Sequence, residues 1–248
     1  MLIDLKFLVD KYSIDPQGLS HFGAHEGQEV PKYKELKFKE VHLFEPQNDI
    51  FKILEKLYAN EENIFLYKFG LGSKSETVSI YADNENNGES ASVLKPKKHT
   101  TLYPEITFDI KEQVEIKAYD SLNIGNVNFL VLDIQGYELF ALKGSKKALS
   151  KIDYIYTEIN REELYENNTT IKQLDSFLKG YNFIRVETRW AKDGYLPWGD
   201  AFYINKKKVS LSRRAIVLLK NIINTSKIYF IYLKAKFVIK FLIKRIIN

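Results

Sequence analysis

Residues 21 to 28 of the chain read His21-Phe22-Gly23-Ala24-His25-Glu26-Gly27-Gln28, between an expected strand at 19–22 and an expected helix at 29–38. Glycines in a strand-to-helix turn let the backbone approach a ligand closely at the carboxyl edge of a sheet. Gly23 and Gly27 are four residues apart, so the spacing is not that of the dinucleotide-binding GxGxxG motif. A plain tight turn would use the same residues, and the segment alone leaves both interpretations open.

Outward from this turn, short runs rich in Val, Ile, Phe and Tyr alternate with segments of helical periodicity, as in βαβ units. We expect strands at 19–22, 41–44, 64–69, 129–132, 154–157, 182–186 and 201–204, and helices at 29–38, 47–58, 137–149 and 171–180. A short amphipathic helix is expected at the amino terminus. The pattern predicts one open, mostly parallel seven-stranded sheet with helices on both faces.

The interval 70–120 interrupts this alternation. Strands are expected at 77–81 and 113–119, and the stretch 84–104 between them is polar, rich in Asn and loop-like. A long ordered loop in a compact domain is more often functional than idle. We therefore expect this loop to contribute to a site.

The composition narrows the class of protein. The 248 residues are 45% apolar, with 16 Phe and 16 Tyr, which predicts a globular core. Cysteine is absent, so disulfides, thiolate zinc sites and a Cys nucleophile are excluded, and a reducing cytosol fits best. The first residues lack the uninterrupted apolar stretch of a signal peptide.

Charge is distributed unevenly along the chain. Residues 201–248 contain 12 Lys and Arg and no Asp or Glu, whereas residues 1–200 carry a net charge of −7. We expect a catalytic domain over 1–208 and a basic amphipathic helical tail over 209–248. No uncharged run in the tail reaches the ~18 residues that a spanning helix requires, but a basic amphipathic helix can lie on an anionic membrane. Packing on the body or on a second subunit is the alternative, so a homo-oligomer stays open.

Two acids end expected strands. Glu45 follows the strand at 41–44, 22 residues after Gly23, where a carboxylate in open α/β sheets accepts hydrogen bonds from ribose hydroxyls. Asp133 ends the strand at 129–132 and would face the same crevice, although it could also cap the next helix. The order of these features along the chain, a glycine-rich turn, a helix, a strand and then an acid, favours a ligand that contains a nucleoside.

Five segments now form a recognisable set. They are Gly23-Ala24-His25-Glu26-Gly27-Gln28, Phe44-Glu45-Pro46, Asp133-Ile134-Gln135-Gly136-Tyr137-Glu138 with Leu142-Lys143-Gly144, Tyr156-Thr157-Glu158, and Trp198-Gly199-Asp200-Ala201. In this order, over residues 19–204, the chain resembles the FkbM family of methyltransferases. The resemblance implies a class I, Rossmann-like fold, S-adenosyl-L-methionine as cofactor, and methyl transfer to a hydroxyl oxygen, commonly on a sugar of a surface glycan or natural product.

The resemblance also implies which residues would contact the cofactor. They are Gly23, Ala24 and Gly27 along the methionine and ribose, Glu45 at the ribose hydroxyls, and Pro46 and Gln47 at the adenine.

His21 stands where class I methyltransferases usually carry an acid. A neutral imidazole can still hydrogen-bond the cofactor, but it cannot balance the methionine ammonium. Asp133 or Glu26 would then take over that role.

Methyl transfer to an alcohol requires a base within hydrogen-bond reach of the hydroxyl. Asp133 is the first candidate because it ends a strand in the crevice, and Glu158 follows by the same argument one strand over. His25 could be the base or a spacer that bonds the backbone. Glu138 and His99 are further candidates.

The loop at 84–104 is interpreted as a lid over acceptor and cofactor. The short polar side chains that would recognise a carbohydrate are Asn87, Glu89, Ser90 and Ser92, with His99 beside them. A solvated basic loop is the alternative for residues 95–99. No metal site is expected, because His21 and His25 would need a helix to share a face and Gly23 lies between them. The alternative is a divalent cation held by Asp133 with Glu158.

The sequence thus predicts an O-methyltransferase acting on a sugar of a glycan or glycolipid, with no nucleic-acid partner. We expect it in the cytoplasm, with peripheral attachment to the membrane through the tail. One alternative is a cofactor-binding scaffold with little or no turnover in a glycan-assembly complex. A second, a nicotinamide-dependent oxidoreductase, explains Glu45 but not the glycine spacing.

Overall fold

A computed structural model describes residues 1–83 and 87–208, so the predicted helical tail at 209–248 lies outside the described residues. The helices and strands are α1 (Leu5–Tyr12), β1 (Gly18–Phe22), α2 (Val30–Glu35), β2 (Glu40–Phe44), α3 (Asn48–Tyr58), β3 (Ile64–Tyr67), β4 (Gly70–Leu71), β5 (Glu76–Asp83), α4 (His99–Leu102), β6 (Phe108–Lys117), β7 (Val127–Leu132), α5 (Glu138–Lys143), β8 (Tyr154–Asn160), α6 (Ile171–Gly180), β9 (Phe183–Trp190) and β10 (Trp198–Asn205). Short 3₁₀ turns lie at Tyr119–Ser121, Ala148–Ser150, Ala191–Gly194 and Lys206–Lys208.

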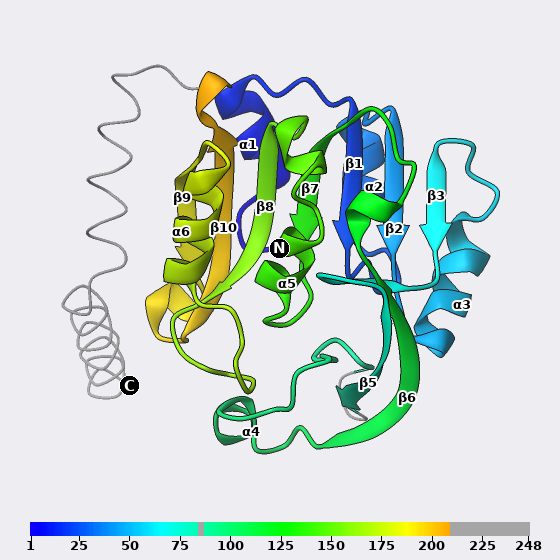
Figure 1. The fold of residues 1–248 in the computed structure, drawn as a ribbon, viewed down its shortest axis with the longest axis vertical. Helices are drawn as coiled ribbons and strands as arrows, with labels where there is room; N and C mark the ends of the chain where they lie inside the picture. Colours follow the sequence, from blue (N-terminus) through cyan, green and yellow to red (C-terminus); the bar gives the residue numbers. More distant parts are fainter. Residues whose placement is uncertain (84–86, 209–248) are drawn as a thin grey trace, which may run out of the picture.

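The main sheet contains, in the described part of the chain, seven strands in the order β3-β2-β1-β7-β8-β10-β9 (Figure 1). The pairs β1–β2, β1–β7, β2–β3 and β7–β8 are parallel. β10 runs antiparallel to both β8 and β9, because only the short turn 191–197 joins it to β9 and a parallel pairing needs a long crossover. The predicted open, mostly parallel sheet of seven strands is confirmed.

Side chains of the sheet alternate between two apolar cores. Phe129 and Val131 of β7 belong to the core that also contains buried side chains of α1, α2 and α3. Leu130 and Leu132 of the same strand belong to the core with α5 and α6. Since side chains of a strand point alternately to opposite faces, helices cover both faces of the sheet, as predicted.

A second sheet of order β4-β6-β5 interrupts the alternation, where the sequence predicts two strands and a loop. β5 and β6 pair antiparallel and enclose residues 87–107 of the described chain, which include the short helix α4. Figure 1 shows β5, β6 and α4 beyond the edge at which β1, β2 and β7 end. We call β5, residues 87–107 and β6 the covering segment.

The ends of helices α6 and α5 can be compared with the predicted ones. The prediction for α6 is confirmed at both ends, and Gln173 Oε1 accepts a hydrogen bond from the Thr170 backbone at its start (2.8 Å). The single helix predicted at 137–149 is wrong, because α5 ends at Lys143 with Gly144 as its C-cap. The Asp120 carboxylate then accepts hydrogen bonds from the backbones of Lys147 and Ala148 (2.8 and 2.9 Å) at the start of the next turn. In the ranges described, no helix has both the length and the apolar character that crossing a membrane requires.

Candidate active site

A cleft of about 560 Å³ lies where the carboxyl ends of the parallel strands meet the covering segment. Its walls include Gly23, Glu45 and Asp133 from the main sheet and Ser90 and Ser92 from the covering segment. On one side β1 pairs with β2, the next strand in the sequence, and on its other side it pairs with β7, which comes later in the sequence. Open α/β sheets bind ligands at such a reversal of strand order.

The glycine-rich turn fastens β1 to its neighbours. Gly23 has φ of +81°, and a Cβ at this position would lie 2.1 Å from the Asp133 carbonyl oxygen, so any side chain is excluded. The backbone N–H groups of Gly23 and Ala24 donate to the Phe44 carbonyl (3.0 and 2.9 Å). Gly23 lines the cleft, whereas the Ala24 methyl lies in the apolar core and Gly27 faces the Tyr58 ring. The cleft lining therefore includes neither Ala24 nor Gly27.

Glu45 is buried and oriented by two backbone donors. Its Oε2 accepts a hydrogen bond from the His25 N–H (3.0 Å), and its Oε1 accepts one from the Gln47 N–H (2.8 Å). Burial raises the pKa of Glu45 to about 7, although these hydrogen bonds oppose the shift. Each carboxylate oxygen has further lone pairs, so the group can accept two more hydrogen bonds from a ligand. Pro46 and Gln47 line the cleft beside it.

The two histidines of the turn have different environments. His21 is buried, its Nδ1 lies 3.1 Å from the Tyr33 hydroxyl, and burial lowers its pKa to about 4, so the ring is neutral at pH 7. In His25, Nδ1 accepts from the Gln28 side-chain amide (2.8 Å), and Nε2 then donates to the Asn87 carbonyl (2.9 Å). Both nitrogens of His25 are thus engaged with the chain itself, and the ring, which also lines the cleft, joins the glycine-rich turn to the covering segment.

Two acids at the ends of β7 and β8 share one amide. Gln135 Nε2 donates to Asp133 Oδ1 at 3.2 Å and to Glu158 Oε2 at 3.3 Å. Burial, followed by the charge of Asp133, raises the pKa of Glu158 well above its ordinary value. Asp133 is exposed to the cleft, and its desolvated surroundings, with the charge of Asp200, raise its pKa to about 6. Of the two acids, Asp133 is the one exposed to the cleft, and Glu158 is the buried one whose ionised form is disfavoured.

Asp200 joins this pair, although sequence reasoning assigned it no role. It lies opposite Glu158 in the β8–β10 register and accepts hydrogen bonds from the Tyr156 hydroxyl and the Leu2 backbone. Glu26, by contrast, is absent from the cleft lining and accepts a hydrogen bond from the Asn87 amide (2.6 Å). Side chains two residues apart on a strand share a face, so Asp200 could have been assigned to the site from its place two residues after Trp198 on the last strand.

Glu138 lies beneath the cleft rather than in its wall. Its Oε1 accepts hydrogen bonds from the backbones of Ile134 (3.3 Å) and Gly136 (3.0 Å), and burial raises its pKa to about 7. The Glu138 carboxylate therefore stabilises the turn that carries Gln135, whose φ is +52°. This acid supports the turn and does not face an acceptor.

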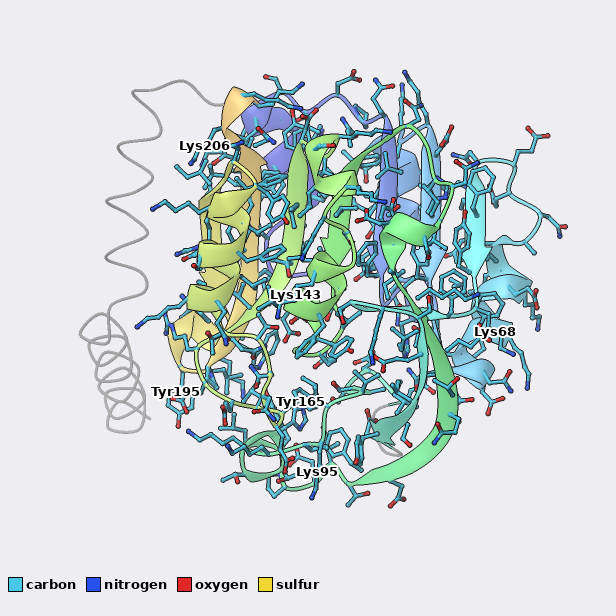
Figure 2. All side chains as sticks on the ribbon, in the orientation of Figure 1. Lys68, Lys95, Lys143, Tyr165, Tyr195 and Lys206 are labelled. Atoms are coloured by element: carbon cyan, nitrogen blue, oxygen red, sulfur yellow. The ribbon has the colours of Figure 1, made fainter. Side chains whose placement is uncertain are left out.

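The covering segment is hydrogen-bonded to the same turn. Ser92 Oγ donates to the Gln135 carbonyl (2.9 Å), and the Tyr165 hydroxyl lies 2.9 Å from the Ser90 carbonyl and 3.1 Å from Gln135 Oε1. Figure 2 shows Tyr165 in the loop after β8, next to the covering segment. The predicted acceptor-binding residues that line the cleft are Glu89, Ser90, Ser92 and His99.

His99 is largely enclosed by aromatic rings. Its ring centroid lies 5.0 Å from that of Tyr103, 5.1 Å from Phe108 and 5.4 Å from Tyr165, and burial lowers its pKa. Across residues 1–83 and 87–208, no group of three or more His, Cys, Asp or Glu is arranged to hold a metal ion.

Comparison with known proteins places these residues in a family. Residues 21–185 match the model of the Methyltransferase FkbM domain. The chain is 22% identical over 172 residues to the 2-O-methyltransferase NoeI of Sinorhizobium fredii (strain NBRC 101917 / NGR234), an alignment that covers 65% of this chain and 71% of that protein. The crystal structure of Methyltransferase FkbM from Methylobacillus flagellatus KT has a TM-score of 0.52 at 17% identity, over 76% of this chain and 43% of that chain.

The chain thus spans less than half of that crystal structure's length, and the likeness to it supports the fold. The family match spans about two thirds of the sequence and includes Gly23, Glu45, Asp133 and Glu158. The chain therefore belongs to the FkbM family of S-adenosylmethionine-dependent methyltransferases.

Proposed function

We propose that this methyltransferase transfers a methyl group to a sugar hydroxyl of a glycan or glycolipid. The observation that carries the proposal is the pair of acids, Asp133 and Glu158, held by one amide at the cleft. A sugar hydroxyl is a weak acid, so its methylation gains from a base whose pKa lies near the working pH. A 2-O-methyltransferase among the relatives of the chain is consistent with an oxygen acceptor.

The cleft residues fit S-adenosylmethionine. The volume of about 560 Å³ is in the range of small-molecule sites, and Glu45 is oriented to accept from both ribose hydroxyls. Pro46, Leu71 and Ile80 give the same region apolar walls suited to a nucleobase. When bound, the cofactor supplies a methyl group on a sulfonium centre.

The residues of the chain would then act on the acceptor. Asp133, ionised and open to the cleft, takes the hydroxyl proton as the new oxygen–carbon bond forms. Ionisation of Glu158 is disfavoured, first by its burial and then by the charge of Asp133, so Asp133 rather than Glu158 acts as the base. Gln135 holds both groups in place.

The test is turnover with a panel of glycans, measured as release of S-adenosylhomocysteine. Asp133→Asn should lower turnover by ~10² to 10⁴ and leave cofactor affinity within a few fold. Asp193→Asn makes the same change in an exposed turn and should have full activity. Full activity of Asp133→Asn would reject Asp133 as the base. Cofactor binding by the wild type without turnover on any glycan would favour the scaffold alternative.

The proposal includes a location. Residues 201–248 carry 12 basic and no acidic side chains, whereas residues 1–200 have a net charge of −7. An anionic bilayer repels such a body, and each well-placed Lys or Arg near the surface contributes ~1 kcal/mol of attraction. The basic tail would hold the enzyme peripherally on the cytoplasmic face of the membrane, where glycolipid acceptors are accessible.

A further inference from the structure

Two aromatic residues line the cleft on the side away from Glu45. Trp198 begins β10, which lies three strands along from β1 in the sheet, whereas Glu45 follows β2 on the other side of β1. Tyr103 follows α4 in the covering segment. Asp133, which ends β7, lies between these two regions in the strand order, so the base separates a cofactor end from an aromatic end.

The two side chains are fixed by a hydrogen bond. Trp198 Nε1 donates to the Tyr103 hydroxyl at 2.9 Å, and the Tyr103 ring lies 5.0 Å from the His99 ring. Both Trp198 and Tyr103 are half-buried and contribute to the cleft wall. The indole N–H is the only polar group of a Trp side chain, so the surface that Trp198 offers to a ligand is hydrocarbon. The Tyr103 hydroxyl accepts this bond and still has a proton to donate.

Acidic residues lie beside this apolar surface. In the β8–β10 register Trp198 is opposite Asn160, and Asp200 is opposite Glu158, so the strand period places Trp198 and Asp200 on the same face. Ile106 also lines the cleft. A flat apolar ring next to carboxylates matches a pyranose, which has C–H groups on its ring faces and hydroxyls around its rim.

We propose that Trp198 and Tyr103 form the subsite for the acceptor sugar. The pyranose ring stacks on the Trp198 indole, Tyr103 holds the indole in place, and one rim hydroxyl is directed toward Asp133. This inference rests on the proposed function, because it names the residues that would bind its acceptor.

The experiment measures sugar binding rather than turnover. The full chain, saturated with S-adenosylhomocysteine, is applied to a glycan array, and each glycan that binds is titrated against the variants. Trp198→Ala should weaken binding by at least about tenfold, the effect of truncating a buried aromatic anchor. Trp198→Phe and Tyr103→Phe, which keep an aromatic ring at each position, should give smaller losses. Calorimetry with S-adenosylhomocysteine should give the same affinity for every variant.

Trp190 provides the matched control. The sequence has two Trp residues, and Trp190 is buried, with the Arg161 guanidinium 3.6 Å from its ring centroid. Trp190→Phe should bind glycan as the wild type does, and the fluorescence of its remaining Trp198 should change when the glycan is added.

The outcomes distinguish the subsite from the proposed function. If the wild type binds a glycan and Trp198→Phe, Tyr103→Phe and Trp198→Ala bind it equally well, the subsite is wrong and the proposed function stands. If the wild type binds the cofactor product but no glycan on the array, the sugar acceptor is wrong and the subsite fails with it. If Trp198→Phe loses affinity for S-adenosylhomocysteine, Trp198 belongs to the cofactor site and the proposal is overturned.

Discussion

Gln135 donates a hydrogen bond from Nε2 to Oε2 of Glu158 at 3.3 Å, across the ends of two adjacent strands. The same amide nitrogen lies 3.2 Å from Asp133 Oδ1, and the amide oxygen lies 3.1 Å from the Tyr165 hydroxyl. One side chain therefore connects the two acids of the cleft to the loop that supports the covering segment.

Replacement of this amide should destabilise the protein. Gln135→Met keeps an unbranched side chain but removes the donor to Oε2 of the buried Glu158, whose Oε1 still accepts from the Asn160 amide (3.2 Å). The free energy of unfolding should therefore fall by ~1 to 3 kcal/mol. Gln113→Met is the matched control, because the exposed Gln113 side chain donates to the Ser79 hydroxyl (2.7 Å) and lies away from the acids. Urea denaturation at pH 7 measures both. Equal losses in the two variants would show that Gln135 does not bridge the acids.

The affinity for S-adenosylmethionine should depend on the ionisation of Glu45. Ribose hydroxyls donate to the ionised carboxylate, and burial raises the pKa of Glu45 to about 7. Affinity should therefore rise ~tenfold from pH 6 to pH 8, as the ionised fraction rises. Glu45→Gln should bind ~1.5 to 3 kcal/mol more weakly at pH 8, since it loses hydrogen bonds to a charged group. Calorimetry across this pH range decides, and an unchanged pH dependence in Glu45→Gln would remove Glu45 from the ribose site.

Glu138 should make the protein less stable as the pH rises. Burial raises its pKa from 4.5 to about 7, so the folded state binds the proton more tightly than the unfolded state does. Its contribution is fully present below pH 4.5, and up to ~3 kcal/mol is lost as the pH rises through 7. Glu138→Gln keeps a neutral side chain of the same shape. It should be more stable than the wild type at pH 8 and similar at pH 5 in thermal unfolding, and a variant less stable at pH 8 would refute this account.

Much of the fold could be predicted because the pattern is local. Phe129 to Leu132 are four apolar residues in a row, as expected of a strand buried on both faces, and Gly180 marks the end of α6. The break after α5 could be predicted only in part: Gly144 directly follows the helix as its C-cap, whereas the Asp120 carboxylate that binds the next turn is more than twenty residues away in the sequence.

The site could be predicted only in part. Glu45 and Asp133 follow strands directly, and parallel strands bring such residues to one edge. The roles of Gln135 and of Asp200 depend on contacts between β7, β8 and β10, which no local pattern encodes. Ala24 was assigned to the cofactor site because it belongs to the glycine-rich motif, but its methyl group lies in the apolar core.

The body should fold without the tail. β10 ends at Asn205, and the Lys207 and Lys208 ammonium groups lie 2.9 and 3.2 Å from the Asp153 carboxylate. Truncation after Lys208 therefore removes none of the residues that form the two cores in the described part of the chain. The truncated protein should bind S-adenosylmethionine but should not sediment with anionic liposomes. The full chain should sediment with them, and less at high salt, because surface attraction is screened. Equal sedimentation of both proteins would refute the membrane proposal.

The most direct test of the account is the position of the transferred methyl group. The full chain is incubated with S-adenosylmethionine that carries a tritiated methyl group, in the presence of a glycan mixture, RNA and peptides. We predict that label enters the glycan as a methyl ether, which is stable to mild base and recovered as an O-methyl sugar after acid hydrolysis, and that Asp133→Asn abolishes most of it. Label that is released as methanol by mild base, or that is found in RNA or peptide, would contradict transfer to a sugar hydroxyl.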